Sequence, residues 1–544
     1  MLGVMAGTTS NHRPVSLLRQ LIMLFAVAPV IVLPPQAIAL PTGGTVVSGN
    51  VAVAQHGGAL SLHQTGDAAI MNWSDFSIGA GETVHVQQAA NAALLNRVTG
   101  ANPSLLLGQF NAAGRVYLIN PNGVVVGAGA NINMQEFIAS SLDVDNAAFL
   151  DFARGARRSL TFQGESKASV VNLGTITAAD GNVVLIAYRV SNEGTIHAAK
   201  GVAGLAAGST VRLRSPADQL IDVETRVAVD TADGTGVGVA NSGTIAAVQA
   251  ELKASGGNLY ALAVNQTGIV HATGVAHLAG RVLLTADGGT VNIDGKLSAH
   301  EADGSGGEVL VGGDYRGANA DVANAAMTQI SAGSVIDVSA TSARGEGGRA
   351  IVWADQQTDF AGKIEGQGGA LGGDGAFVEV SGKHVLNYAG LADLSAAFGA
   401  TGTLLLDPDQ AIISAATDDP SNGAFNHTVL STNLASANVI VDASAYGDGA
   451  GSLLGEIIVN APVTWSSGNT LTLKAGNSIA VNADLTGTGG DIVFQGMGAT
   501  TGASITVDSA ATITANSLTI GQNPDAAFVG LNPIPARFRS LNAI

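Results

Sequence analysis

Two pairs of neighbouring carboxylates have the spacing closest to that of a catalytic centre. Asp407 and Asp409 lie in LLLDPDQ, and Asp418 and Asp419 lie in TDDPSNG. Glycosidases need two carboxylates about 5–10 Å apart across a cleft, with aromatic side chains that stack on the sugar. Each pair here has a proline beside it and no Trp, Tyr, Arg or Lys close in sequence. The pattern therefore indicates turns and strand ends rather than catalysis.

Histidine and glycine-rich segments predict no metal site. His271 and His277 in HATGVAH have no third ligand near them, and HEADG at 300–304 lacks the second histidine of a zinc-protease motif. The segment GGDGAFVEV at 372–380 is a single copy of a pattern that binds calcium only in tandem. Cysteine is absent, which excludes disulfides, thiolate ligands and a cysteine nucleophile. We therefore predict no catalytic residue, no metal and no cofactor, in a protein that is not an enzyme.

The composition favours a folded chain that does not bind nucleic acid. Glycine supplies 72 of the 544 residues, charged residues make up 12% and aromatic residues 4%. That glycine content is about twice the average share. Because 46% of the residues are hydrophobic, the chain can bury a core of small and branched side chains. The net charge of −18 and the lack of a basic tract argue against nucleic-acid binding.

The N-terminus has the three parts of a secretory signal peptide. Arg13 and Arg19 form the basic region, Leu21–Leu33 is an apolar run, and Ala37 and Ala39 form a cleavage site of small residues. The apolar run is shorter than the about 20 residues that span a bilayer. We therefore expect export, with cleavage after Ala39.

A unit of the form Asn-x-Gly-Thr-Ile recurs in the middle of the chain. It reads NLGTI at 172–176, NEGTI at 192–196 and NSGTI at 241–245, and looser copies begin at Asn265, Asp294, Ala332 and Ala361. The first two copies are 20 residues apart, a spacing typical of one coil of a solenoid. Short β-branched runs bounded by Gly, Asn or Asp surround the units. The longest helix candidate is NAALLNRVTG at 91–100.

These patterns predict an all-β protein that folds as a parallel β-helix. Stacked coils would place Val, Ile, Leu and Ala in inward ladders, about 4.8 Å apart. Gly and Asn would supply positive φ angles at the tight turns. The alternatives are β-sandwich modules in series and a β-propeller. Sandwiches usually carry more aromatic residues and clearer two-residue hairpins, and a propeller repeats an aromatic signature every 40–50 residues. The β-helix is therefore favoured.

Four segments near the N-terminus carry a family resemblance. They are LPTGGTVVSGNVAV at 40–53, NWSDFSIGAGETVHVQQ at 72–88, ALLNRVTGANPSLLLGQF at 93–110 and GRVYLINPNGVVVGAGANINMQEFIASSLDV at 114–144. In this order they resemble the secretion domain of two-partner-secretion exoproteins, the TpsA proteins of the filamentous haemagglutinin family with its haemagglutination activity domain. Later segments up to about residue 520 resemble the passenger regions of that family more loosely.

The resemblance implies a right-handed β-helix with an N-terminal cap. It also implies a partner, an outer-membrane β-barrel transporter of the TpsB type with periplasmic transport domains. Carried over by position, the secretion motif that the transporter recognises falls on eight residues of two short segments. These residues are Asn120, Pro121, Asn122 and Gly123, and Asn96, Arg97, Val98 and Thr99. Val124 stands where the family often has isoleucine.

The first of these segments also predicts a sharp turn on physical grounds. Asn120, Pro121 and Gly123 occupy the first, second and fourth positions that a type I turn favours. Asn122 would also suit the left-handed position of a type II turn. We therefore expect a corner between the apolar runs VYLI and VVVG, and the resemblance implies that the transporter needs this corner, either directly or because it nucleates the first coils.

The domain organisation follows from the same patterns and the resemblance. We predict a signal peptide at 1–39, a two-partner-secretion domain at 40–290, a glycine-rich β-helical passenger at 291–405, a further β-helical passenger at 406–525 and an irregular C-terminus at 526–544. The irregular C-terminus leads to the hypothesis that the chain is a truncated or short member of the family.

By resemblance, the chain would be a secreted exoprotein of a Gram-negative bacterium. It would reach the cell surface through the Sec pathway and the periplasm, and it would bind an unidentified ligand on host or bacterial cells as an adhesin does. The alternatives are a carbohydrate-active β-helix enzyme, which would use residues such as Asp407 or Asp419, and a haem-capture or toxin-type exoprotein.

Overall fold

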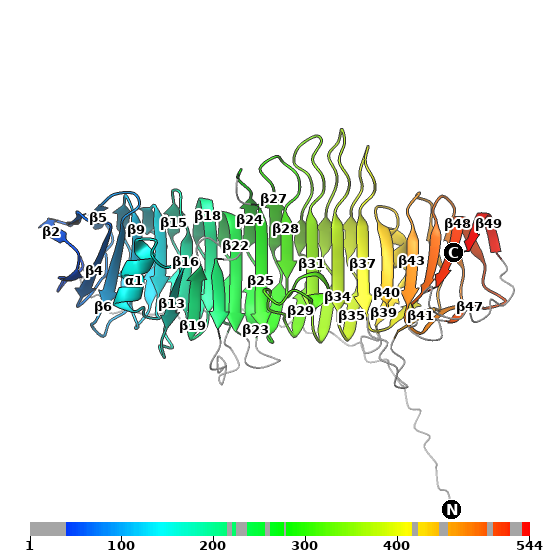
Figure 1. The fold of residues 1–544 in the computed structure, drawn as a ribbon, viewed down its shortest axis with the longest axis horizontal. Coiled ribbons are helices and arrows are strands. Elements are labelled where there is room, and N and C mark those ends of the chain that lie inside the picture. Colours follow the sequence, from blue (N-terminus) through cyan, green and yellow to red (C-terminus); the bar gives the residue numbers. More distant parts are fainter. Residues whose placement is uncertain are drawn as a thin grey trace, which may run out of the picture. The chain divides into compact units, whose positions relative to one another are not determined.

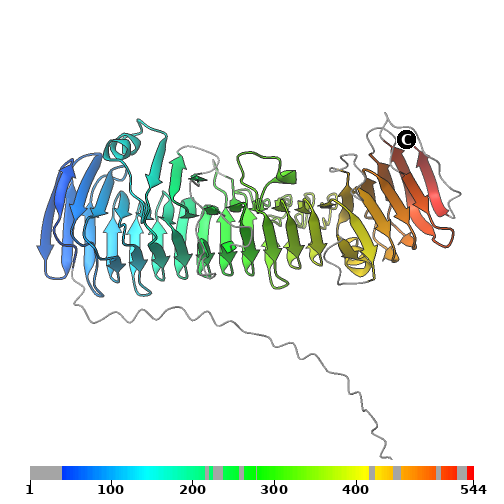
Figure 2. The same cartoon turned by 90° about the horizontal axis from the view of Figure 1, so that it is seen from below.

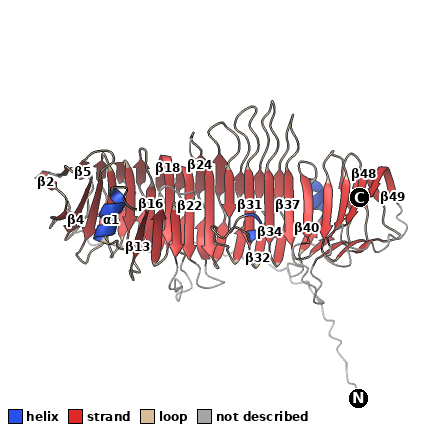
Figure 3. Ribbon diagram, in the orientation of Figure 1, coloured by secondary structure: helices blue, strands red, loops and turns tan. Residues whose placement is uncertain are grey.

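A computed structural model of the chain is a parallel β-helix, which confirms the predicted fold class (Figure 1, Figure 3). The expected cleavage residues Ala37 and Ala39, together with Asp418, Asp419 and His277, lie outside the described residues. The structure describes residues 40–214, 220–224, 237–255, 262–276, 279–415, 423–444, 455–497, 504–522 and 536–543.

The strands stack in three columns, which we name A, B and C, and each coil passes through A, then C, then B. The coil that begins at Arg115–Ile119 (β9, column A) continues through Val124–Val126 (β10, column C) and Asn131–Met134 (β11, column B). Neighbouring strands within a column run parallel, which requires a crossover between them, and here the crossover is the rest of the coil.

Column A contains these strands, each paired with the next: β4 (Ala68–Trp73), β6 (Ala93–Val98), β9, β12 (Glu136–Ser140), β16 (Val183–Ala187), the second halves of β18 (Thr195–Ala207) and β22 (Thr244–Ser255), β25 (Arg281–Asp287), β28 (Glu308–Val311), β31 (Arg349–Ala354), β34 (Phe377–Gly382), β37 (Thr403–Pro408), β40 (Asn438–Ala443), β43 (Leu471–Ala475), β46 (Ile492–Gly496), and the second halves of β48 (Ile513–Gln522) and β49 (Ala536–Ala543).

Column B contains β3 (Ala59–Gln64), β5 (Thr83–Gln87), β8 (Gln109–Ala112), β11, β15 (Thr175–Ala178), the first halves of β18 and β22, β24 (Ile269–Thr273), β27 (Lys296–His300), β30 (Val335–Asp337), β33 (Lys363–Glu365) and β36 (Leu391–Asp393), and later β42 (Val463–Trp465), β45 (Leu485–Gly487) and the first halves of β48 and β49.

Column C contains β7 (Ser104–Leu106), β10, β14 (Ser169–Asn172), β17 (Arg189–Asn192), β21 (Val239–Asn241), β23 (Leu262–Gln266), β26 (Thr290–Ile293), β29 (Met327–Ile330), β32 (Gln357–Phe360) and β35 (Val385–Tyr388), followed by a five-stranded sheet of β39 (Ala424–Asn426), β38 (Ala411–Ser414), β41 (Glu456–Val459), β44 (Ser478–Val481) and β47 (Ser504–Val507).

An antiparallel cap begins the stack. Thr45–Ser48 (β1) pairs antiparallel with β4, and Val51–His56 (β2) pairs antiparallel with β3. From β5 onward the pairs within the columns are parallel. The cap that the resemblance implied is therefore present.

The isoleucine of the recurring unit forms an inward ladder in column B. Ile176, Ile196 and Ile245 are aligned in register and fully buried. The ladder continues through Val270 and Leu297. Each rung thus removes one branched side chain from water, which contributes about 2 kcal/mol. Stacking identical side chains explains why so few residue types suffice for the core.

The asparagine of the unit forms a second, polar ladder at the end of the column C strands. Asn172 donates to Asn192 at 2.7 Å, Asn192 donates to Asn241 at 2.7 Å, and Asn241 donates to Gln266 at 2.7 Å. The fourth rung is therefore Gln266, one residue later than the predicted start at Asn265. Because each buried amide bonds to the next, the ladder satisfies polar groups that burial would otherwise penalise.

The glycine of the unit has a role that differs from the prediction. Gly194 and Gly243 do not have positive φ angles. A Cβ atom at Gly243 would instead collide with the carbonyl oxygen of Gly194 in the coil below, and one at Gly194 would collide with that of Gly174. Close approach of stacked backbones therefore requires glycine here. Positive φ angles occur at other glycines, including Gly123.

An additional layer covers the outer face of column A near its start (Figure 2). It consists of Asn146–Ala153 (α1), capped by Asp145, and the sheet of Ser159–Gln163 (β13), Thr210–Arg214 (β19) and Ile221–Glu224 (β20). Phe149 of α1 packs edge-on against Tyr117 of β9, with ring centroids 5.1 Å apart. This layer explains why the column A strands are apolar on both faces.

The helix prediction for residues 91–100 is wrong, because Ala93–Val98 forms strand β6 between β4 and β9. Pairing on both edges outweighs the local preference of a short segment. The described residues form two α-helices, α1 and His427–Asn433 (α2), and a 3₁₀ turn at Tyr315–Gly317 (η1). None of these is long and apolar enough to cross a membrane.

Four long loops from column B to column A rise together as arches (Figure 1). They are joined by backbone hydrogen bonds, from Gly306 to Glu346 at 2.7 Å, from Gly347 to Asp374 at 2.8 Å and from Gly375 to Ala400 at 2.9 Å. The arches are residues 301–307, 338–348, 366–376 and 394–402.

Candidate functional site

The predicted corner at Asn120–Gly123 connects β9 in column A to β10 in column C. The amide nitrogen of Gly123 donates to the carbonyl of Asn120 at 2.9 Å, as in a closed β-turn. Among the described residues, the one non-glycine with a positive φ is Arg316, so Asn122 does not adopt the left-handed conformation. The turn therefore fits the type I alternative and excludes type II.

Asn120 is fully buried and joins three consecutive coils. Its side-chain nitrogen donates to the carbonyl of Asn102 and to the hydroxyl of Ser104 in the preceding coil, both at 3.0 Å. Its backbone nitrogen donates to the carbonyl of Ser140 in the following coil at 2.9 Å. Its side-chain oxygen accepts from the backbone of Asn122 at 2.9 Å. Asn120 therefore holds the corner in place.

Pro121 and Asn122 are the exposed part of the corner. The side chain of Asn122 donates to the carbonyl of Gly100 at 2.8 Å, and the hydroxyl of Ser166 donates to the carbonyl of Pro121 at 2.6 Å. A Cβ atom at Gly123 would lie 2.8 Å from the carbonyl oxygen of Ser169, so its backbone also packs against the next coil. These contacts fix the shape that the corner presents to solvent.

The second motif, Asn96–Thr99, ends β6 just before the corner of the preceding coil. Asn96 and Val98 are buried, and Asn96 accepts a hydrogen bond from the indole of Trp73 at 3.0 Å. Thr99 donates to the carbonyl of Trp73 at 3.1 Å. Because Gly100 and Asn102 accept from the Asn120–Gly123 corner, the structure brings the two motifs together at stacked corners.

Arg97 faces outward from the second motif and fastens the α1 layer to the β-helix. Its guanidinium donates to Asp143 at 2.8 Å, to the carbonyl of Val144 at 2.8 Å and to the side chain of Asn146 at 2.7 Å. A planar group with donors on three nitrogens satisfies all three acceptors at once, which lysine cannot reproduce. Local sequence does not reveal this role, because the acceptors lie more than 40 residues away.

The eight motif residues therefore divide into those that build the corner and those that face solvent. Asn96, Val98, Asn120 and Gly123 are buried, whereas Pro121, Asn122 and Thr99 are exposed and Arg97 is half-buried. The arrangement places no pair of acid and base beside a nucleophile. Its chemistry is that of a shaped polar surface.

The carboxylates of the sequence analysis lie far along the chain from this corner. Asp407 is at the end of strand β37, as expected, but it is fully buried and paired with Arg316 at 3.6 Å. Asp409 contacts the imidazole of His384 at 2.9 Å. Sequence reasoning missed both basic partners because it looked only at near neighbours. Within the described residues, no group of three His, Cys, Asp or Glu side chains is arranged to hold a metal ion.

Comparison with known proteins gives one family and two relatives. A family model described as TPS secretion domain matches residues 37–299. Heme/hemopexin-binding protein of Haemophilus influenzae (strain ATCC 51907 / DSM 11121 / KW20 / Rd) is 34% identical over 254 residues, which are 46% of this chain and 27% of that protein. A second Haemophilus influenzae protein of that name is 38% identical over 87 residues, 16% of this chain and 9% of that protein.

A solved structure matches as well. The crystal structure of the HMW1 secretion domain from Haemophilus influenzae aligns with a TM-score of 0.50 and 28% sequence identity, over 68% of this chain and 100% of that one. The matches to the two named relatives span about a quarter of their length or less. Both motif corners fall inside the range that the family model matches.

Proposed function

From the match of residues 37–299 to the TPS secretion domain, we propose that a cognate outer-membrane barrel of the TpsB type exports this chain from the periplasm as a two-partner-secretion exoprotein. The signal peptide at 1–39 directs the chain through the Sec pathway, and the periplasmic domains of the barrel engage residues 40–290. The family match at the N-terminal coils, with both motifs at stacked corners, supports the proposal.

The burial of Asn120 supports a folding role for the corner. A chain that crosses the outer membrane unfolded gains free energy when its first coils close outside the cell. Asn120 bonds to the preceding and following coils, so those coils cannot close properly without it. Pro121 and Asn122 remain the surface at which direct contact with the transporter would occur.

Export is tested by expressing the chain with its cognate barrel and measuring protein in the medium and in the periplasm. We expect Asn120→Ala with Asn122→Ala to leave the mature chain in the periplasm while the signal peptide is still removed. Asn477→Ala is the matched control, because Asn477 makes an exposed side-chain bond to Glu456 in a distant coil. Undiminished release of the double variant would reject a role for the corner in export.

For the exported chain, we propose adhesin-like binding through the arches. Phe398 and Leu371 lie in neighbouring arches and are 77% and 56% exposed, the highest values for large hydrophobic side chains in the described part of the chain. Exposed apolar side chains at a projecting edge favour contact with another surface. The names of two relatives favour a second candidate, capture of haem or hemopexin.

A binding assay separates these candidates. The purified mature chain is tested for adherence to host cells, for binding of hemopexin and for a change in the absorption spectrum of haem. We expect Phe398→Ser with Leu371→Ser to lower adherence at least about fivefold, because burying two such side chains contributes a few kcal/mol. Exchange of the half-exposed Leu391 for serine is the control. Haem or hemopexin binding that the arch substitutions leave unchanged would favour the second candidate.

Catalysis is the remaining alternative. Asp407, one of the two carboxylates that this alternative would use, is fully buried and paired with Arg316.

A further inference from the structure

A strap of residues 312–325 lies over the outer face of column A in the middle of the stack (Figure 2). It leaves β28, contains the η1 turn and returns to β29. Val322 of the strap is buried against Leu283, Leu310, Ile351 and Trp353 of the strands beneath it. Gly317 lies directly on the indole of Trp353, where a Cβ atom would not fit.

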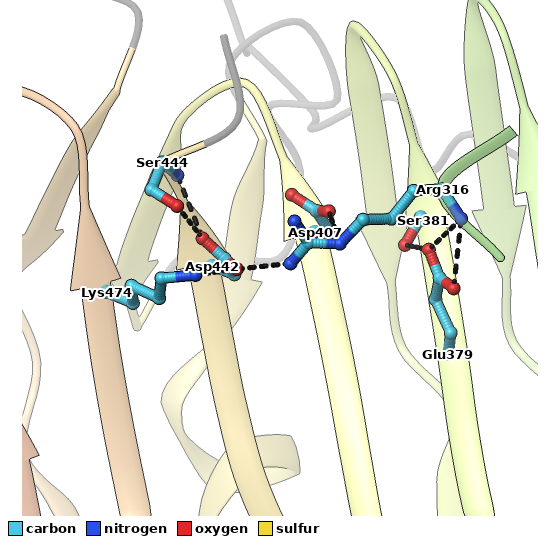
Figure 4. A network of polar contacts seen from close by, with 7 residues as sticks. All are labelled: Arg316, Glu379, Ser381, Asp407, Asp442, Ser444 and Lys474. Carbon is cyan, nitrogen blue, oxygen red and sulfur yellow. Dashed lines mark hydrogen bonds and ion pairs between the residues drawn. The ribbon is translucent and has the colours of Figure 1, made fainter. Parts of the chain in front are cut away.

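Arg316 fastens the strap to three later coils (Figure 4). Its guanidinium donates to Asp442 of β40 at 2.6 Å, and its Nε lies 3.6 Å from Asp407 of β37. Its backbone nitrogen faces both carboxylate oxygens of Glu379 in β34, at 3.1 and 3.3 Å. Arg316 has a φ of 54°, a costly conformation for a residue with a side chain. The contacts to the carboxylates therefore hold a strained residue in place.

The carboxylates beneath Arg316 are buried and incompletely satisfied. Glu379 and Asp407 have no exposed surface, and Asp442 is 1% exposed. Neither carboxylate oxygen of Asp407 accepts a hydrogen bond from the described residues. Arg316 and Lys474, which lies 3.0 Å from Asp442, offset part of the three negative charges. Arg349 also acts on Glu379, but it is itself paired with Asp314 and Glu308. Full ionisation would thus leave a buried excess of negative charge.

Two of these carboxylates titrate near neutral pH. Burial raises the pKa of Asp407 to about 7, the charge of Asp442 adds to this effect, and Arg316 opposes it. Burial also raises the pKa of Glu379 to about 7, against hydrogen bonds from Ser381 and Arg316. Burial would raise the pKa of Asp442 as well, but hydrogen bonds from Ser444 and Lys474 outweigh burial, so this pKa lies below its ordinary value.

A second set of ion pairs lies around the strap, and its Arg349 also acts on Glu379. Arg349 of β31 contacts Asp314 of the strap at 2.8 Å and Glu308 of β28 at 2.6 Å. Burial raises the pKa of Asp314, but hydrogen bonds from Asn319 and Tyr315 outweigh it, so this pKa lies below its ordinary value. Asp314 and Arg349 therefore keep their charges between pH 6 and 8. The ring of Tyr315 is tilted against that of Phe377, with centroids 5.9 Å apart, and it lies beside the guanidinium of Arg316.

We propose that the strap is a pH-gated lid, which is closed while Asp407 and Glu379 hold protons and opens when both are ionised, exposing the apolar patch of Leu283, Leu310, Ile351 and Trp353. Opening lets water solvate the carboxylates, which return toward their ordinary pKa values. Because the closed state binds the protons more tightly, closure is favoured at low pH and is lost as pH rises through about 7. The pKa values of Asp407 and Glu379 are raised even though Arg316 lies beside both carboxylates, so the effect of burial outweighs the attraction of the guanidinium.

The absence of cysteine from the chain permits a direct test. In the mature chain, Val322→Cys places a buried thiol under the strap, and Ala323→Cys places an exposed thiol beside it. The ratio of their labelling rates with a maleimide removes the intrinsic pH dependence of the thiol. Ionisation of each carboxylate favours opening of the strap about tenfold between pH 6 and 8. We therefore expect the labelling rate of Val322→Cys, divided by that of Ala323→Cys, to rise at least about tenfold and up to about a hundredfold.

Neutral variants identify the groups responsible. Asp407→Asn with Glu379→Gln should remove the rise, whereas Asp359→Asn, which changes a carboxylate in column C, should keep it. As a measurement without a cysteine, acrylamide quenching of the unsubstituted chain should increase over the same range, since Trp353 lies under the strap. A labelling ratio or quenching that is constant from pH 6 to 8, or a rise that persists in the neutral double variant, would overturn the proposal.

Discussion

Replacing Gly243 with alanine is expected to lower the stability of the β-helix by about 3 kcal/mol or more. The new Cβ atom would collide with the carbonyl oxygen of Gly194, which is backbone and cannot move aside like the end of a flexible side chain. To make room, the two coils would have to separate, which would break the hydrogen bond between Asn192 and Asn241 beside them. The shift in the midpoint of urea unfolding, followed by circular dichroism, measures the effect.

Gly129→Ala is the matched control for this substitution. Gly129 has no atom within 4 Å of the position of a Cβ, and its φ angle is not positive. Alanine also restricts the unfolded chain, so the control is expected to be neutral or to stabilise by about 0.5 kcal/mol. Equal unfolding midpoints for the two variants would show that the glycine ladder is not needed for close stacking of the coils.

Replacing Asn120 with alanine is expected to lower the stability of the secretion domain by about 3 kcal/mol. The substitution leaves the carbonyl of Asn102 and the backbone nitrogen of Asn122 without their bonds, and it removes the buried partner of the Ser104 hydroxyl. Unpaired polar groups in a dry interior are costly. We expect export to fall together with stability, because the first coils no longer close.

Asn122→Ala separates folding from recognition. Asn122 is exposed and loses its bonds to Gly100 and Asn120, which contribute about 0.5 kcal/mol at an exposed site. We therefore expect near-normal stability and near-normal export. If this variant is stable in urea but stays in the periplasm, the transporter reads the exposed corner directly, and the folding account of the motif is wrong.

The repeating unit allowed the fold to be predicted, because three of its positions each form a ladder. The isoleucine ladder of Ile176, Ile196 and Ile245 follows from spacing and hydrophobicity alone. The looser copy of the unit was placed one residue early, at Asn265, since Asn265 and Gln266 are both amides and sequence does not set their register. The reason for the glycines, contact between coils, also needed coordinates.

The corner at Asn120–Gly123 was predicted as a turn, but its contacts were not. Sequence identified the turn at Asn120 and left its type open, and the backbone of Asn122 decided it. Proximity of this turn to the Asn96–Thr99 motif depends on the stacking of two coils. The role of Arg97 depends on the α1 layer, which follows more than 40 residues later in the chain and which no local sequence pattern predicts.

The sequence by itself determined the class of this protein. An all-β solenoid and its recurring coil follow from short-range patterns, because a solenoid repeats the same local structure in each coil. The expected export rests on the signal-peptide pattern and the family resemblance, and the motif residues rest on the resemblance. Tertiary structure alone decided which residues meet across coils. Arg316 and Asp442 are 126 residues apart, and only the crossing of the strap over column A brings them within 2.6 Å. Contacts of that range depend on the accumulated register of every coil between them, and local sequence does not encode it.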